Sequence, residues 1–173
     1  MRERSGRVAA CAAIAALLAC AALPAAAREV VYFDEAVQPG TIVVKTTERR
    51  LYLALGDGRA IRYRVAVGKP GKQWFGWRVV DGKHVKPAWS PPADVKRDNP
   101  RLPDVIPGGA PGNPMGARAL TLNGDLYAIH GTSASMRRSI GTYASYGCIR
   151  MLDEDIVDLF ERVRVGTPVV VTR

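Results

Sequence analysis

Short runs of apolar residues recur along most of the chain and indicate β-strands. Between residues 41 and 67, three runs rich in Val, Ile, Leu and Tyr are separated by short polar segments, and the second and third flank Asp57 and Gly58. Asp-Gly between two such runs is a strong signal for a β-hairpin. The pattern therefore predicts strands at 41–46, 50–55 and 60–67.

The C-terminal third combines further strands with one amphipathic helix. Residues 118–123 and 126–130 have the composition of strands, whereas apolar residues recur at helical spacing in 152–163, where acidic residues stand at the start. Gly166, Thr167 and Pro168 end this helix, and 169–172 predicts a closing strand. We therefore expect a mainly β fold, a sandwich or open barrel, with one prominent helix.

Pro and Gly interrupt the pattern throughout residues 68–116, which include KPAWSPP and VIPGGAPGNPMG. Such a density of helix breakers and turn formers predicts long ordered loops or very short strands. Four interleaved aromatic residues favour loops that cover a site over a disordered segment; they are Trp74, Phe75, Trp77 and Trp89.

Residues 1–27 have the three parts of a secretory signal peptide: arginines, an apolar run at 8–23, and alanines before Arg28. The apolar run is shorter than the roughly 20 residues that span a bilayer, so we expect export without a stable transmembrane anchor. Lipid attachment at Cys20 is the alternative, although Leu18 makes that match imperfect. Residues 28–40 are interpreted as a lead-in, and 41–173 as a single domain.

Export with cleavage of residues 1–27 would change the number of cysteines and the net charge of the mature chain. Cys11 and Cys20 fall within the predicted signal, so the mature chain keeps Cys148 alone. A single thiol in an exported protein indicates an intermolecular bridge or a reactive group, and a small buried hydrophobe is the alternative. The formal charge of +9 falls to about +7 without residues 1–27, which suits anionic envelope polymers; nucleic acid is not expected as a partner.

The neighbours of Cys148 meet the needs of a nucleophilic thiol, which requires a base or a positive field. His130 ends a predicted strand, Arg150 supplies positive charge, and the helix that follows favours an anion at its start. Gly147 would expose the sulfur and let amides face an oxyanion. The second histidine, His84, lies in the loop-rich stretch. The alternative is that His130 is a core histidine and Arg150 caps a surface.

Metal and phosphate sites are not expected. One mature cysteine and two histidines 46 residues apart form no compact zinc pattern, and the acidic cluster at 153–155 is interpreted as helix-start charge. The chain also lacks the GxxxxGK[ST] phosphate loop. We therefore expect no metal and no organic cofactor.

The segment from His130 to Met151, HGTSASMRRSIGTYASYGCIRM, resembles the signature of the L,D-transpeptidase (YkuD-type) family. That signature is a His, then after about 14 to 17 residues Ser or Thr, His, Gly, Cys, a hydrophobic residue, and Asn or Arg. Here 14 residues separate His130 from Ser145, and Tyr146 is the single departure. Further segments are similar to the Gram-negative periplasmic branch: TIVVKTTERRLYL, VGKPG, PAWSPP, NPMGARAL and VGTPVVV. The resemblance covers 41–173 and identifies it as an L,D-transpeptidase catalytic domain.

The resemblance implies that Cys148 is the nucleophile and His130 the base. It assigns the substrate-facing and oxyanion region to five further residues: Gly131, Ser145, Tyr146, Gly147 and Arg150. The family often has a second histidine where Tyr146 stands. Because the base role falls on the first histidine, and because a phenol still donates a hydrogen bond, we expect an active enzyme with altered rate or selectivity.

The implied substrate is the peptide stem of peptidoglycan in the periplasm. The thiolate would attack the carbonyl of the third residue, D-Ala would leave, and an amine would take the acyl group from the enzyme. A neighbouring stem as acceptor gives a 3→3 cross-link, an envelope protein gives a tether, and water gives carboxypeptidase activity. Sensitivity to carbapenems is also implied.

Other classes fit the motif less well. Sortase-like transpeptidases place their histidine much farther from the cysteine, and papain-like and NlpC/P60-type hydrolases place the cysteine before the histidine. A non-catalytic module that binds the cell envelope, in which Tyr146 marks lost activity, stays open as an alternative.

Overall fold

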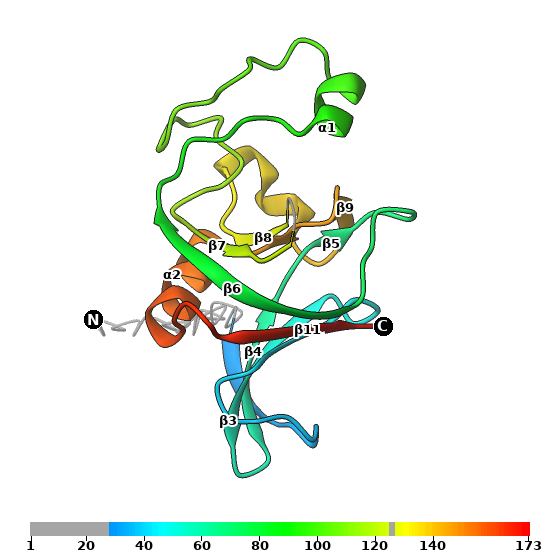
Figure 1. Ribbon diagram of the computed structural model, residues 1–173, viewed down its shortest axis with the longest axis vertical. Coiled ribbons are helices and arrows are strands. Elements are labelled where there is room, and N and C mark those ends of the chain that lie inside the picture. The colour runs from blue at the N-terminus through cyan, green and yellow to red at the C-terminus, as the bar shows by residue number, and fades with distance from the viewer. Residues whose placement is uncertain (1–27, 125–126) are drawn as a thin grey trace, which may run out of the picture.

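A nine-stranded mixed sheet dominates residues 28–124 and 127–173, the part of the chain that this computed structural model describes (Figure 1). Its strands follow the spatial order β1 (Arg28–Tyr32), β4 (Arg59–Arg64), β3 (Arg50–Gly56), β2 (Ile42–Lys45), β11 (Pro168–Thr172), β6 (Gly76–Val85), β7 (Arg118–Leu122), β8 (Ala128–His130) and β10 (Ile149–Arg150). Two short parallel strands, β5 (Val67–Gly68) and β9 (Tyr143–Ser145), pair separately. The predicted signal peptide at 1–27, including Cys20, lies outside the described residues.

The sheet curls because β6 belongs to both of its halves. Its first residues pair with β11 and its last with β7, and the register shifts between Val80 and Gly82, where a bulge increases the twist. A bridge between Ala66 and Arg150 then brings the β10 edge back to the chain that follows β4. The expected mainly β fold, with the open-barrel alternative and one prominent helix, is confirmed.

The predicted hairpin is also confirmed. Strands β3 and β4 pair antiparallel, and the residues that join them, Asp57 and Gly58, have φ angles of 52° and 66°. Positive φ at both central residues is the requirement of the hairpin turn that matches strand twist, and Asp-Gly meets it at low cost. The strands expected at 41–46, 118–123 and 169–172 form as β2, β7 and β11.

Helix α2 (Asp153–Arg162) packs its apolar side against one face of the sheet, one residue shorter at each end than expected. Ile156 and Leu159 are fully buried there with residues of β2, β3, β7 and β8. A second apolar cluster lies apart from this one and includes Phe33, Tyr52 and Val170. The main core therefore lies between the sheet and α2.

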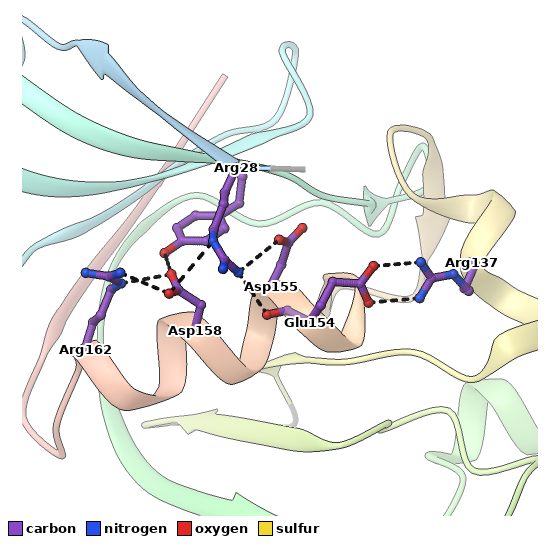
Figure 2. A network of polar contacts seen from close by, with 7 residues as sticks. Arg28, Arg137, Glu154, Asp155, Asp158 and Arg162 are labelled. Atoms are coloured by element: carbon purple, nitrogen blue, oxygen red, sulfur yellow. Dashed lines mark hydrogen bonds and ion pairs between the residues drawn. The ribbon is translucent and has the colours of Figure 1, made fainter. Parts of the chain in front are cut away.

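Polar contacts join β1 to α2 (Figure 2). The Arg28 guanidinium donates a hydrogen bond to the Glu154 carbonyl at 3.2 Å and lies 4.0 Å from Asp155 and 3.9 Å from Asp158. Glu154 also forms a two-pronged pair with Arg137, which belongs to the 3-10 helix η1 (Ala134–Ser139). Strand β1 and helix η1 are therefore both tied to helix α2.

Three elements correct the sequence prediction. The stretch 68–116 was expected to hold loops or very short strands, but it contains the ten-residue β6 and the helix α1 (Ala93–Asp98). The lead-in at 28–40 begins with β1, which pairs with β4 over its whole length. None of the α1 residues is buried, so no apolar periodicity marks it.

Among the described residues, no helix combines the length and apolar character that crossing a membrane requires.

Candidate active site

Strands β8 and β10 lie side by side and parallel, with Ile129 opposite Ile149 and His130 opposite Arg150. Side chains alternate between the two faces of a strand, and Cys148 stands two residues before Arg150. His130 and Arg150 therefore project from one face of the sheet, and Cys148 directly precedes β10, although it stands 18 positions after the histidine in the sequence. All three line one pocket with a volume of about 680 Å³.

The segment 86–116 forms the opposite wall of this pocket. Figure 1 shows it arching above β8, β9 and η1, with α1 at its far side. The pocket wall that it contributes is mainly apolar and includes Trp89, Pro92, Val95, Leu102 and Ile106. The position of this wall agrees with the expectation that the loops cover a site.

His130 is almost fully buried, and its Nδ1 lies 2.7 Å from the Gly131 carbonyl oxygen. A carbonyl only accepts, so this hydrogen bond places a proton on Nδ1, and Nε2 is then the acceptor nitrogen of the neutral ring. Burial, with a smaller contribution from the positive charge of Arg150, lowers the pKa of His130 to about 4. The imidazole is therefore neutral at physiological pH and able to accept a proton.

Cys148 is half-buried, and burial raises the pKa of its thiol. A hydrogen bond from the Ala128 backbone and the charge of Arg150 act in the opposite direction. The sequence placed the helix directly behind the cysteine, but α2 begins five residues later, after β10. The backbone group at the sulfur thus comes from the neighbouring strand, and the resting site holds a thiol beside a neutral imidazole.

A buried serine shapes the turn that carries the sulfur. The Ser145 hydroxyl donates to the Cys148 carbonyl at 2.6 Å and accepts from the Gly147 amide at 3.1 Å. Gly147 has φ of +124°, and a Cβ there would clash with the ring of Tyr127. Trp74 stacks on Tyr127 and donates from Nε1 to the Gly147 carbonyl at 2.9 Å. These contacts hold the turn in one conformation.

Asp153 holds the chain that follows His130. Its Oδ1 accepts hydrogen bonds from the Ala117 and Thr132 amides at 2.9 and 3.1 Å, and only a glycine fits beside it at Gly131. From the sequence, this carboxylate was interpreted only as negative charge at the start of the helix. No pattern in the sequence connects residue 153 with residue 117, so this role, like that of Trp74, was missed.

Arg150 and Tyr146 occupy different situations in the pocket. The Nε of Arg150 is buried without a hydrogen-bond partner, and none of the carboxylates in the described residues lies within ion-pair distance of its guanidinium. The Tyr146 hydroxyl instead donates to Asp98 at the end of α1, at 2.6 Å.

His84 lies on β6, contacts Thr121 and does not line the pocket. Within the described ranges, no three His, Cys, Asp or Glu side chains are grouped to hold a metal ion.

A family model described as the L,D-transpeptidase catalytic domain matches residues 39–171. A protein of Escherichia coli K12 named probable L,D-transpeptidase YbiS is 42% identical over 135 residues, which cover 74% of this chain and 43% of that protein. The chain thus spans less than half the length of this curated relative.

Solved structures share the fold. An L,D-transpeptidase from Mycobacterium smegmatis has a TM-score of 0.61 at 16% identity, over 77% of this chain and 58% of that one. A Brucella melitensis protein named a probable carnitine operon oxidoreductase is 40% identical, with a TM-score of 0.56, over 87% of this chain and 96% of that one.

Proposed function

Because the chain belongs to the family of L,D-transpeptidase catalytic domains, we propose that it transfers the acyl group of a peptidoglycan tetrapeptide stem to an amine. One observation carries the proposal: His130, the last residue of β8, and Cys148, directly before the adjacent parallel strand β10, line the same pocket, whose opposite wall comes from α1 and its flanking loops. The Escherichia coli relative fits the Gram-negative branch that the sequence resembles.

Acylation begins when Nε2 of His130 takes the thiol proton as the sulfur of Cys148 attacks the carbonyl carbon of the third stem residue. The bond from that carbon to the D-Ala nitrogen then breaks, and the imidazolium returns its proton to the leaving amine. A thioester remains on Cys148. Because burial favours the neutral forms of both groups, the proton moves during attack and not before it.

Deacylation uses the same histidine in the same two roles. An amine attacks the thioester, the carbon–sulfur bond breaks, and the proton lost by the amine reaches the sulfur through His130. The product is an amide when the acceptor is a stem side chain or an envelope protein, and a free carboxylate when the acceptor is water. The apolar wall of segment 86–116 reduces access of water, which favours transfer.

Arg150 is proposed to bind a carboxylate of the stem. A guanidinium in a pocket whose Nε has no hydrogen-bond partner among the described residues is suited to an anionic ligand group, because its desolvation is then offset by a charge-assisted hydrogen bond. Tetrapeptide stems present a terminal carboxylate close to the scissile bond. Replacement of Arg150 by Met should raise KM for the stem about tenfold or more, whereas Arg118→Met should leave it close to wild type.

The test is incubation with defined tetrapeptide-stem muropeptides, followed by mass spectrometry of the products. We expect cross-linked dimers and released D-Ala from the wild type, and none from Cys148→Ala or His130→Ala. His84→Ala is the matched control, since this histidine lies outside the pocket. Unchanged product from Cys148→Ala would rule the proposal out.

Exposure to a carbapenem separates the enzyme from a non-catalytic envelope-binding module. A covalent adduct on Cys148 supports the enzyme, and its absence together with an unreactive thiol supports the module. The same experiment on whole cells, combined with fractionation, tests export to the periplasm. That location rests on the signal-like pattern of residues 1–27.

A further inference from the structure

Tyr146, which stands where relatives often have histidine, connects the turn before Cys148 to the wall of the pocket. Its hydroxyl donates to Oδ2 of Asp98 at 2.6 Å, across 48 residues of sequence. Asp98 is the last residue of α1, and Tyr146 lies two residues before the sulfur. The contact therefore joins the turn that carries Cys148 directly to the segment that forms the opposite wall of the pocket.

Lys69 completes a three-residue cluster with Tyr146 and Asp98. Its ammonium lies 3.7 Å from the centroid of the Tyr146 ring and 3.6 Å from the Asp98 carboxylate. The backbone of Lys69 is fixed in turn, because its amide donates to the Ser145 carbonyl at 2.9 Å. The hydrogen bond from Tyr146 is also the main cause that lowers the pKa of Asp98.

Helix α1 depends on such polar contacts because it has no apolar anchor. It has six residues, none of them buried, and an isolated helix of this length is unstable in water. Apart from the Asp98 cluster, the polar side-chain contacts that fix α1 to the rest of the described chain are an ion pair from Lys72 to Asp94 and contacts of Lys96 with the chain just beyond it. Four residues of α1 and its C-cap line the pocket beside Cys148 and His130: Ala93, Asp94, Val95 and Asn99.

We propose that Tyr146 is a positioning residue that fastens α1 over the pocket and so sets the partition of the Cys148 thioester between amine transfer and hydrolysis. The inference rests on the proposed function. When α1 is fastened, water has less access to the acyl carbon while the bound acceptor competes for it. Histidine is shorter than tyrosine and would not reach Asp98 unless α1 moved.

The test compares Tyr146→Phe, Asp98→Ala and the double variant, with Tyr143→Phe as matched control. Tyr143 lies on the same strand region, but its hydroxyl contacts Arg49 and Thr47 instead of α1. With tetrapeptide-stem muropeptide as donor and acceptor, the ratio of dimer to hydrolysed tripeptide should fall about two- to tenfold in each single variant. The double variant should fall no further, because both changes remove one contact.

A second readout needs no peptidoglycan. Amide exchange at residues 95–99, followed by NMR, should accelerate in Tyr146→Phe and Asp98→Ala by a similar factor and stay unchanged in Tyr143→Phe. Independent, additive effects in the double variant, or unaltered exchange at α1, would overturn the inference. If no variant and no wild-type protein forms a thioester, the proposed function fails, and the exchange data alone decide whether Tyr146 fastens α1.

Discussion

The burial of His130 fixes the pH range in which Cys148 can react. Because its pKa is lowered to about 4, the imidazole stays unprotonated well below the usual range of histidine near 6.5. We expect the acid limb of kcat/KM for stem acylation to have its midpoint near pH 4 to 5. Initial rates of stem acylation across this pH range, compared with those at neutral pH, measure it. A midpoint near 6.5 would show that the base is not this buried imidazole.

Two neighbouring acidic residues on α2, Asp153 and Glu154, are expected to differ in their contribution to stability. Asp153→Ala removes the acceptor of two amide hydrogen bonds next to Gly131, so we expect a loss of about 2 to 4 kcal/mol in the free energy of unfolding and slower acylation. Glu154→Ala breaks a solvent-exposed pair with Arg137 and should cost less than about 1 kcal/mol. Urea unfolding of both variants measures the two losses in free energy. Equal losses would contradict the structural role assigned to Asp153.

At the level of elements, α2 carries a buried carboxyl that weakens the fold at neutral pH. Asp155 is fully buried, neither of its oxygens has a hydrogen-bond partner among the described residues, and Figure 2 shows Arg28 as the cation facing it. Burial, with the charges of Glu154 and Asp158, raises the pKa of Asp155 from 3.8 to about 6 despite the attraction of Arg28. The ion pair at 4.0 Å therefore does not offset the loss of hydration.

The sign of the pH effect follows from this shift. A carboxyl with a higher pKa in the folded chain keeps its proton longer there, so stability falls as pH rises from 3.8 to about 6 and stays lower above it. Asp155→Asn should raise the free energy of unfolding by about 1 to 2 kcal/mol at pH 7.5 and have little effect at pH 4. Urea unfolding at both values measures it.

Asp158 is the matched control one turn further along the helix. Its pKa is lowered, chiefly by the hydrogen bond from Arg162, and Tyr63 also donates to it at 2.6 Å. Asp158→Asn should therefore destabilise the protein at pH 7.5, opposite in sign to Asp155→Asn. The same sign for both variants would show that charge on the helix, and not burial, governs its stability.

The elements that the sequence predicted are those that bury a periodic apolar face, such as the β3–β4 hairpin and α2. The elements it missed do not. Strand β1 is an edge strand with exposed residues, α1 buries none, and β6 alternates between half-buried and exposed positions because it serves both halves of the sheet. Pro and Gly around β6 and α1 gave a correct signal for loops but hid these short ordered pieces.

At the scale of the whole molecule, the candidate site too could be predicted only in part from the sequence. His130 and Cys148 were predicted as site residues because strand and motif signals mark them, and the parallel pairing of β8 with β10 brings the two segments side by side. The contacts that support them cross the fold: Asp153 to Ala117, Trp74 to Gly147, and Tyr146 to Asp98. Each joins residues at least 36 positions apart with no shared sequence pattern. Such contacts follow from the closure of the barrel and need a structure to be seen.

Residues 28–40 are expected to contribute to the stability of the folded domain. The sequence places its start at Thr41, yet β1 pairs with β4, and Phe33 stacks on Tyr52 at 4.8 Å over the second apolar cluster. A chain that starts at Thr41 should lose at least about 3 kcal/mol in unfolding free energy relative to one that starts at Arg28, since an aromatic anchor and an edge strand are both removed. Urea unfolding of the two chains measures this.

The same truncation should leave the chemistry of folded molecules unchanged, because every residue that lines the pocket lies between Lys72 and Arg150. The alkylation rate of Cys148, corrected for the folded fraction, is the readout. A chain that starts at Phe33 separates the two contributions, since it keeps the stacked ring and loses only β1. If all three chains unfold at the same urea concentration, residues 28–40 are a lead-in as the sequence predicted, and the contacts of β1 add nothing to the fold.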